Sequence, residues 1–150
     1  MVERRDVFAE IEKRIIQGKI SGFSNAEIVE RFGVDQEMIA VFDNLTLGNK
    51  VSKIQKLVRE GQADTSGLPQ EDMKLHSVQS RYVTGILCGE NEEELMRHCG
   101  SFSPRDLRKL RKIIYGRLGV VNDLQIAAWR ALVSKKQGVD YTPFRDARTY

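Results

Sequence analysis

The stretch ERFGVDQEMIAVF, Glu30 to Phe42, places one glycine between two runs of residues with helical spacing. Gly33 can adopt the left-handed backbone that the end of a helix often needs. Apolar Val34, Ile39 and Phe42 follow at intervals that bring them to one side of a second helix. The two helices can then share a small core across a tight turn. This stretch therefore predicts a helical fold.

Helical patterns continue on both sides of this stretch. Apolar residues recur at helical spacing from about Glu3 to Gln17, and Ser24 to Glu27 form a capping box that starts a short helix before Gly33. Asp35 is expected to cap a third helix from about Gln36 to Leu45, and Asn49 is expected to cap a fourth that ends at Gly61. Residues 1–60 are therefore expected to form an N-terminal helical bundle.

The composition changes in GQADTSGLPQED, and residues 61–75 are expected to be a linker or long loop. Residues 76–137 are expected to form a C-terminal helical domain, with helices in NEEELMRHCG, in SPRDLRKLRKIIYGRL and from about Val121 to Lys136. Within it, residues 76–90 are open between helix and strand, because β-branched residues are frequent there. The tail, residues 138–150, lacks periodicity. The expected fold class is all-α.

The composition is typical of a globular protein. Of the 150 residues, 41% are hydrophobic and 30% charged, with a net charge of only +3. The chain has no long apolar run, and it begins MVERRD without the apolar stretch of a signal peptide, so we expect a cytoplasmic protein with no membrane partner. Two cysteines, Cys88 and Cys99, imply no disulfide framework. A short similarity between Arg31–Val34 and Arg117–Val120 is interpreted as coincidence.

The segment from Asn25 to Asn44 resembles the helix-turn-helix superfamily of DNA-binding proteins. The residues that carry the resemblance are Val29, Gly33, Val34, Ile39 and Phe42. The resemblance implies that the exposed side of the second of these helices enters a DNA groove. The side chains that it would offer are Gln36, Glu37, Ala40 and Asn44, together with Asp35 and Val41.

The sequence departs from that family in its charge. No Lys or Arg lies between Val34 and Asn49, whereas three acids do, and DNA affinity depends largely on cations that meet phosphates. Positive charge must therefore come from other helices. Lys50 and Lys53 lie on the fourth helix, and the helix after Ser103 has one continuous basic face. That face consists of Arg105, Arg108, Lys109 and Lys112, with Arg111 at its border.

Enzyme motifs are not found in the sequence. Adjacent residues on a helix point about 100° apart, so His98 and Cys99 cannot form an activated pair. The histidines and cysteines have no zinc-like spacing. We therefore expect no catalytic residue, no metal and no cofactor.

The favoured hypothesis is a small regulatory or accessory protein that binds double-stranded DNA, with a homodimer presenting two reading helices. The alternative is a protein-protein interaction module whose helix-turn-helix docks or dimerises and whose basic face binds an acidic protein or RNA.

Overall fold

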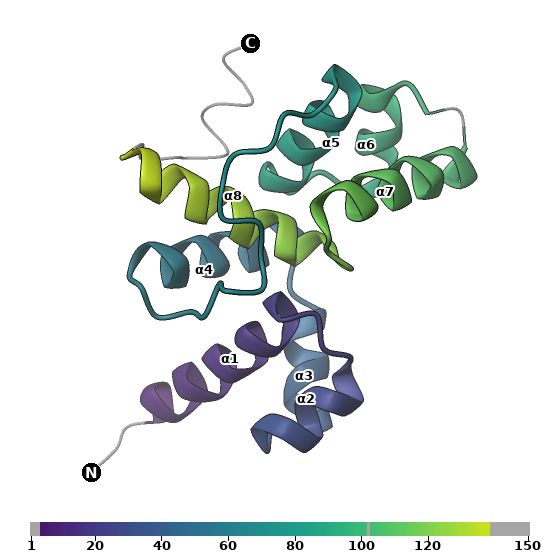
Figure 1. The fold of residues 1–150 in the computed structure, drawn as a ribbon. Coiled ribbons are helices and arrows are strands. Elements are labelled where there is room, and N and C mark those ends of the chain that lie inside the picture. Colours follow the sequence, from purple (N-terminus) through teal and green to yellow (C-terminus); the bar gives the residue numbers. More distant parts are fainter. Residues whose placement is uncertain (1–3, 102, 139–150) are drawn as a thin grey trace.

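The computed structural model of the chain describes residues 4–101 and 103–138, and the described residues form eight α-helices and no strand (Figure 1). The helices are α1 (Arg4–Ile20), α2 (Asn25–Phe32), α3 (Gln36–Asp43), α4 (Leu47–Arg59), α5 (Ser77–Leu87), α6 (Glu92–Cys99), α7 (Pro104–Leu118) and α8 (Asp123–Gln137). The all-α prediction is confirmed, and the region left open between helix and strand is α5. The predicted tail, apart from Gly138, lies outside the described residues.

Three local details differ from the sequence predictions. Helix α1 continues through Gly18 to Ile20 instead of ending near Gln17. Helix α4 begins earlier than predicted, because the Thr46 hydroxyl and not Asn49 caps it, accepting a hydrogen bond from the backbone N–H of Asn49 at 3.2 Å. Asp35 occupies the cap position of α3, but its side chain makes no capping hydrogen bond.

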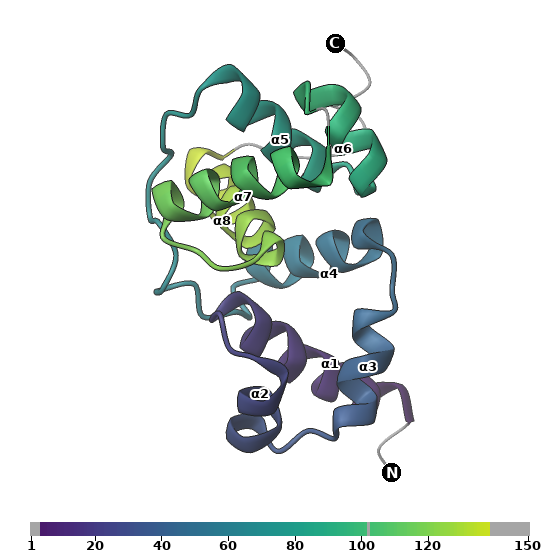
Figure 2. The ribbon, with the colours of Figure 1, turned by 90° about the vertical axis from the view of Figure 1, so that its right-hand side faces the viewer.

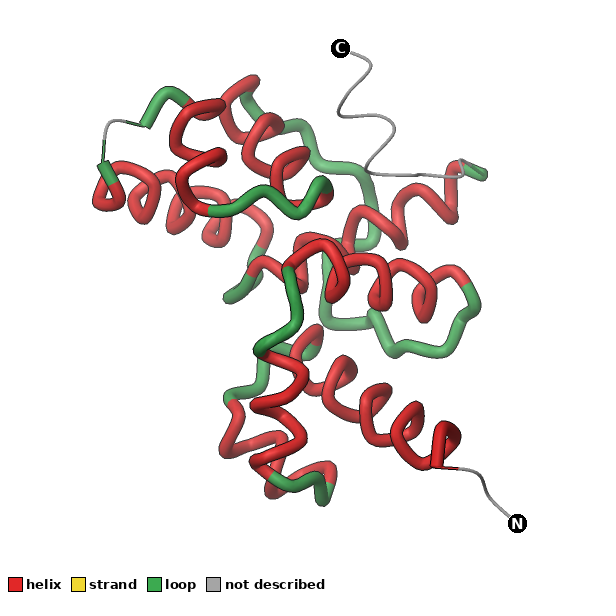
Figure 3. Tube along the Cα trace, turned by 180° about the vertical axis from the view of Figure 1, so that it is seen from behind, coloured by secondary structure: helices red, strands yellow, loops and turns green. Residues whose placement is uncertain are grey.

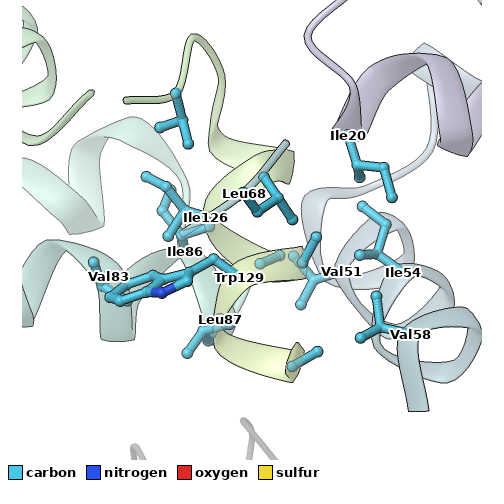
Figure 4. Close-up of a cluster of buried hydrophobic side chains, with 14 of the residues drawn as sticks. Ile20, Val51, Ile54, Val58, Leu68, Val83, Ile86, Leu87, Ile126 and Trp129 are labelled. Atoms are coloured by element: carbon cyan, nitrogen blue, oxygen red, sulfur yellow. The ribbon is translucent and has the colours of Figure 1, made fainter. Parts of the chain in front are cut away.

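Helices α4 and α8 lie against each other in the middle of the molecule (Figures 1 and 2). Helices α1 to α3 lie on one side of this pair, and α5 to α7 lie on the other. Figure 4 shows the buried contact, whose side chains include Val51, Ile54 and Val58 of α4, Ile126 and Trp129 of α8, and Ile86 and Leu87 of α5. One continuous apolar core therefore joins the two halves of the chain.

The segment that connects α4 to α5 is irregular but fastened to the core (Figure 3). Leu68 is buried, and the indole N–H of Trp129 donates to the backbone carbonyl of Glu71 at 3.0 Å. Arg130 also pairs with Asp72 at 2.9 Å. The expected linker therefore runs along α8 and is held there by side chains of that helix.

Helices α5 and α6 share local structural features with α1 and α2. Each residue of the second pair that carries such a feature lies the same number of residues after its counterpart in the first pair. The first shared feature is a helical glycine that lets the next helix approach. A Cβ at Gly18 would lie 2.5 Å from Ile28 Cγ1, and a Cβ at Gly85 would lie 2.4 Å from Leu95 Cδ2. Such distances are far below van der Waals contact, so both glycines allow a close approach between helices.

The same offset relates the caps of α2 and α6. Capping boxes start both helices, from Ser24 with Glu27 and from Asn91 with Glu94. Left-handed glycines end both helices, with φ of 64° at Gly33 and 67° at Gly100. Gly22 and Gly89, also related by this offset, have φ of 82° and 71°. The similarity between residues 31–34 and 117–120 is not this repeat, because those residues end α2 and α7, which are not equivalent.

The two four-helix units, α1–α4 and α5–α8, contact each other in a reciprocal way. Helix α1 contacts α8 of the other unit, and α5 contacts α4. Gly22 lies against the start of α8, where its Cβ would be 3.3 Å from Val121 Cγ2. Gly89 lies against the start of α4, where its Cβ would be 2.9 Å from the Cα of Gly48. The chain therefore has the arrangement of a dimer within one polypeptide.

Candidate nucleic-acid interface

The exposed face of α3 is where the sequence places groove-reading side chains. Gln36, Glu37, Ala40 and Asn44 are all exposed. The helix is only eight residues long, and Glu37 lies in its first turn. An acid in the first turn stabilises a helix through its dipole, but it opposes the approach of a phosphate.

Three cations near α3 are engaged by that helix or by α1. The Lys50 ammonium donates to the backbone carbonyl of Asp43 at 3.1 Å, at the end of α3. Lys53 pairs with Glu12 at 3.0 Å, and Lys19 pairs with the Asp43 carboxylate at 2.8 Å. These cations neutralise acids and carbonyls within the unit. A phosphate that met these three cations would therefore have to displace interactions that already exist.

The other predicted basic residues lie on helix α7, where their side chains are exposed and form no ion pair among the described residues. Arg105, Arg108, Lys109 and Lys112 are all exposed on one face of the helix. Their spacing of three and four residues places the four side chains in one stripe. Among the described residues none of them forms an ion pair or a side-chain hydrogen bond, so their charge is available to a partner.

The inner side of α7 holds the helix in place. Leu107, Ile114 and Leu118 are buried, and the Ser103 hydroxyl caps the helix by accepting from the backbone N–H of Asp106 at 3.2 Å. Pro104 occupies the first turn, where its lack of an N–H costs nothing. The sequence pattern predicts this cap and an apolar stripe of Leu107, Leu110, Ile113, Ile114 and Leu118. The cap is confirmed, but Ile113 is 58% exposed and lies outside the buried stripe.

A polar cluster locks α7 to α5 and α8, and it removes Arg111 from the exposed basic face. The Arg111 Nε donates to the Tyr82 hydroxyl at 2.7 Å. The hydroxyls of Tyr82 and Tyr115 each donate to Asp123 Oδ1 at 2.7 Å. Burial first, and then the Asp123 carboxylate, raises the pKa of both tyrosines well above the ordinary value of 10.0, so both remain hydrogen-bond donors.

The predicted DNA-contacting residues therefore lie on two separate surfaces. Helix α3 and helix α7 lie in opposite parts of the molecule, with α4 and α8 between them (Figure 2). The repeat explains the arrangement, because α7 follows α6 in the second unit as α3 follows α2 in the first. The sequence analysis considered only the segment from Asn25 to Asn44 and overlooked the repeat of its helices in the second unit. The signal was present in the glycines at 18, 22 and 33, which recur at 85, 89 and 100.

Other features bear on alternative activities. His98 Nδ1 lies 3.1 Å from Glu90, which also accepts from Arg81 at 2.8 Å, so the histidine faces a carboxylate instead of the adjacent cysteine. Burial raises the pKa of the Cys99 thiol and leaves it protonated and weakly nucleophilic. In residues 4–101 and 103–138, no three His, Cys, Asp or Glu side chains gather closely enough to hold a metal ion. No helix in the same range is long and apolar enough to span a membrane.

Comparison of the chain with protein-family models, with curated proteins and with solved structures finds no match.

Proposed function

We propose that the protein binds double-stranded DNA through α7, acting as the second helix of a helix-turn-helix in the second unit. The observation that carries this proposal is the stripe of Arg105, Arg108, Lys109 and Lys112, exposed and without ion-pair partners among the described residues. Counterion release from phosphates is the main source of DNA affinity, and it requires cations that are free to meet them.

The position of the charge along α7 also supports the proposal. The helix has 15 residues, and at 1.5 Å per residue it is about 22 Å long. The four cations lie in its first nine residues, and the N-terminal part of a recognition helix is the part that contacts base edges. Arg105 and Arg108 can donate two hydrogen bonds to a guanine edge, whereas Lys109 and Lys112 suit phosphates.

The proposal gives α3 no part in the same contact. Helices α3 and α7 lie in different parts of the molecule (Figure 2), and the proposed contact is made by α7. The acids of α3 would also oppose DNA at that surface. The resemblance to a helix-turn-helix in the first unit predicts a separate set of DNA contacts, and these contacts remain a prediction. Their residues are Gln36, Glu37, Ala40, Asn44, Lys50 and Lys53.

The test is a titration of a labelled mixed-sequence duplex followed by fluorescence anisotropy across a salt series, with the mass of the protein measured by sedimentation. The test variant reverses two charges, Arg108→Glu with Lys112→Glu. The matched control, Arg14→Glu with Lys56→Glu, changes one Arg and one Lys in the same way, and both of these are exposed residues outside α7.

Each lost phosphate contact makes the slope of log K against log salt shallower by about 0.9, so the α7 variant, which loses the phosphate contact of Lys112, is expected to flatten it by about 1. Its affinity at low salt falls by more than about tenfold, while the control pair stays near the wild type. Equal losses in both variants would show that only net charge matters. An unchanged α7 variant would remove this helix from the interface.

A further inference from the structure

An apolar groove runs between α1 and α3 in the first unit. Two hollows, of about 410 Å³ and 180 Å³, lie along the contact of these helices, and both are lined by Ile11 and Met38. Phe8 is 55% exposed and Val41 60% exposed, and both line the smaller hollow. Clustered large apolar side chains at a groove mark a binding surface more often than isolated ones do.

The second unit has a basic side chain at the position equivalent to one wall of the smaller hollow. Ile15, which lines the smaller hollow, corresponds through the repeat to Tyr82. The Arg111 guanidinium lies over the ring of Tyr82, 5.8 Å from its centre, and hydrogen-bonds to its hydroxyl. The residue that corresponds to Arg111 through the repeat is Asn44, which carries no charge. The first unit therefore has no basic side chain at the place where the second unit has one.

The α3 side of the groove is acidic, because Asp35 lines the larger hollow and Glu37 is exposed on α3. On the α1 side the acids are paired, Glu10 with Lys13 at 3.7 Å and Glu12 with Lys53 at 3.0 Å, and Arg14 also lines the larger hollow. Within α3 and its flanks, from Val34 to Asn49, the sequence contains acids and no Lys or Arg. A partner for this surface therefore combines apolar anchors with positive charge.

We infer that the groove between α1 and α3 binds a basic amphipathic helix of a protein partner. Apolar side chains of that helix enter the two hollows, and its Lys or Arg side chains meet Asp35 and Glu37. This is the helix-in-groove mode, in which anchors spaced by three or four residues fill successive pockets. The two units then have different ligands, with protein at α3 and nucleic acid at α7.

The test uses the full chain and two labelled peptides of about 15 residues, long enough to form a helix on binding. One has a Leu-Lys pattern with helical amphipathicity, and the other carries Glu in place of each Lys. Binding is measured by fluorescence anisotropy at physiological salt. The variant Val41→Lys removes an apolar wall and adds a repelling charge. The matched control is Val121→Lys, because Val121 is 65% exposed and lies before α8, outside the groove.

The Lys peptide is expected to bind, and the Glu peptide to bind at least about tenfold more weakly. Val41→Lys lowers the affinity for the Lys peptide by a similar factor, while Val121→Lys and the helix content by circular dichroism stay near the wild type. Equal binding of both peptides, or no effect of Val41→Lys, would overturn the inference. Self-association that Val41→Lys abolishes would identify a second copy as the occupant and also overturn it. DNA binding measured on the same variants keeps this result separate from the proposed function.

Discussion

Replacing Gly85 by alanine tests the close approach of α5 and α6 that defines the repeat. The new Cβ would lie 2.4 Å from Leu95 Cδ2 and 2.7 Å from Glu90 Oε1, and Leu95 is only 3% exposed, so the neighbour has little room to move. Overpacking of this kind costs about 1–3 kcal/mol, whereas alanine in a helix gains about 0.5–1 kcal/mol over glycine. We expect a net loss of about 1–2 kcal/mol.

The chain provides a matched pair of comparisons. Gly18, Gly85 and Gly116 are each the third residue from the end of their helix. Gly18→Ala meets Ile28 Cγ1 at 2.5 Å and is expected to behave like Gly85→Ala. Gly116 has no atom within 4 Å of its built Cβ, so Gly116→Ala should gain about 0.5–1 kcal/mol.

The assay is urea unfolding followed by circular dichroism at 222 nm, with the slope m compared among variants. In thermal unfolding, each kcal/mol should change Tm by about 2–4 °C for a chain of this size. If Gly85→Ala and Gly18→Ala were as stable as Gly116→Ala, the helices would not approach as closely as described, and the physical basis of the repeat would be refuted.

Two further substitutions test buried polar groups. Asp123→Asn weakens the acceptor shared by the two tyrosine hydroxyls and should cost about 1.5–3 kcal/mol in urea unfolding, whereas Asp35→Asn, which loses no capping hydrogen bond, should cost far less. Burial acts to raise the pKa of Glu90, but hydrogen bonds from Arg81 and His98 outweigh it and hold this pKa below the ordinary 4.5. The resulting stability is present above that value and is lost as pH falls through the lower, folded-state pKa. Glu90→Gln should therefore be less stable than the wild type at neutral pH and lose less stability on acidification. The control Glu93→Gln, which changes an exposed residue, should keep the wild-type dependence of stability on pH. The same pH dependence in both variants would contradict the role of Glu90.

The helices could be predicted from the sequence mainly where their ends carry strong local signals. Ser24 with Glu27 forms the predicted capping box, and Ser103 caps α7 as expected, because these hydrogen bonds depend only on residues three positions apart. The region of α5 was ambiguous, since Tyr82 and Val83 are compatible with both helix and strand. This helix packs against α4, α6 and α8, and the local sequence holds no information about these contacts with distant segments.

The candidate site was less predictable, because the availability of a charge depends on non-local partners. Lys53 and Lys112 look alike in the sequence, yet Lys53 is paired with Glu12 of α1, and Lys112 has no ion-pair partner among the described residues. Arg111 likewise belongs to the helix with the basic face but turns inward to Tyr82. Spacing along a helix predicts which side a residue faces, but it does not predict what lies opposite.

The reciprocal packing of α1 on α8 and of α5 on α4 has a consequence for how this molecule can change over generations. In a symmetric homodimer one gene specifies both subunits, so every substitution occurs in both, and the equivalent helices of the two subunits keep the same charge. In this chain the two units are encoded by different parts of one gene, so a mutation in one unit does not change the other. An acidic α3 and a basic α7 can therefore coexist on one scaffold, each free to diverge while the shared core is retained.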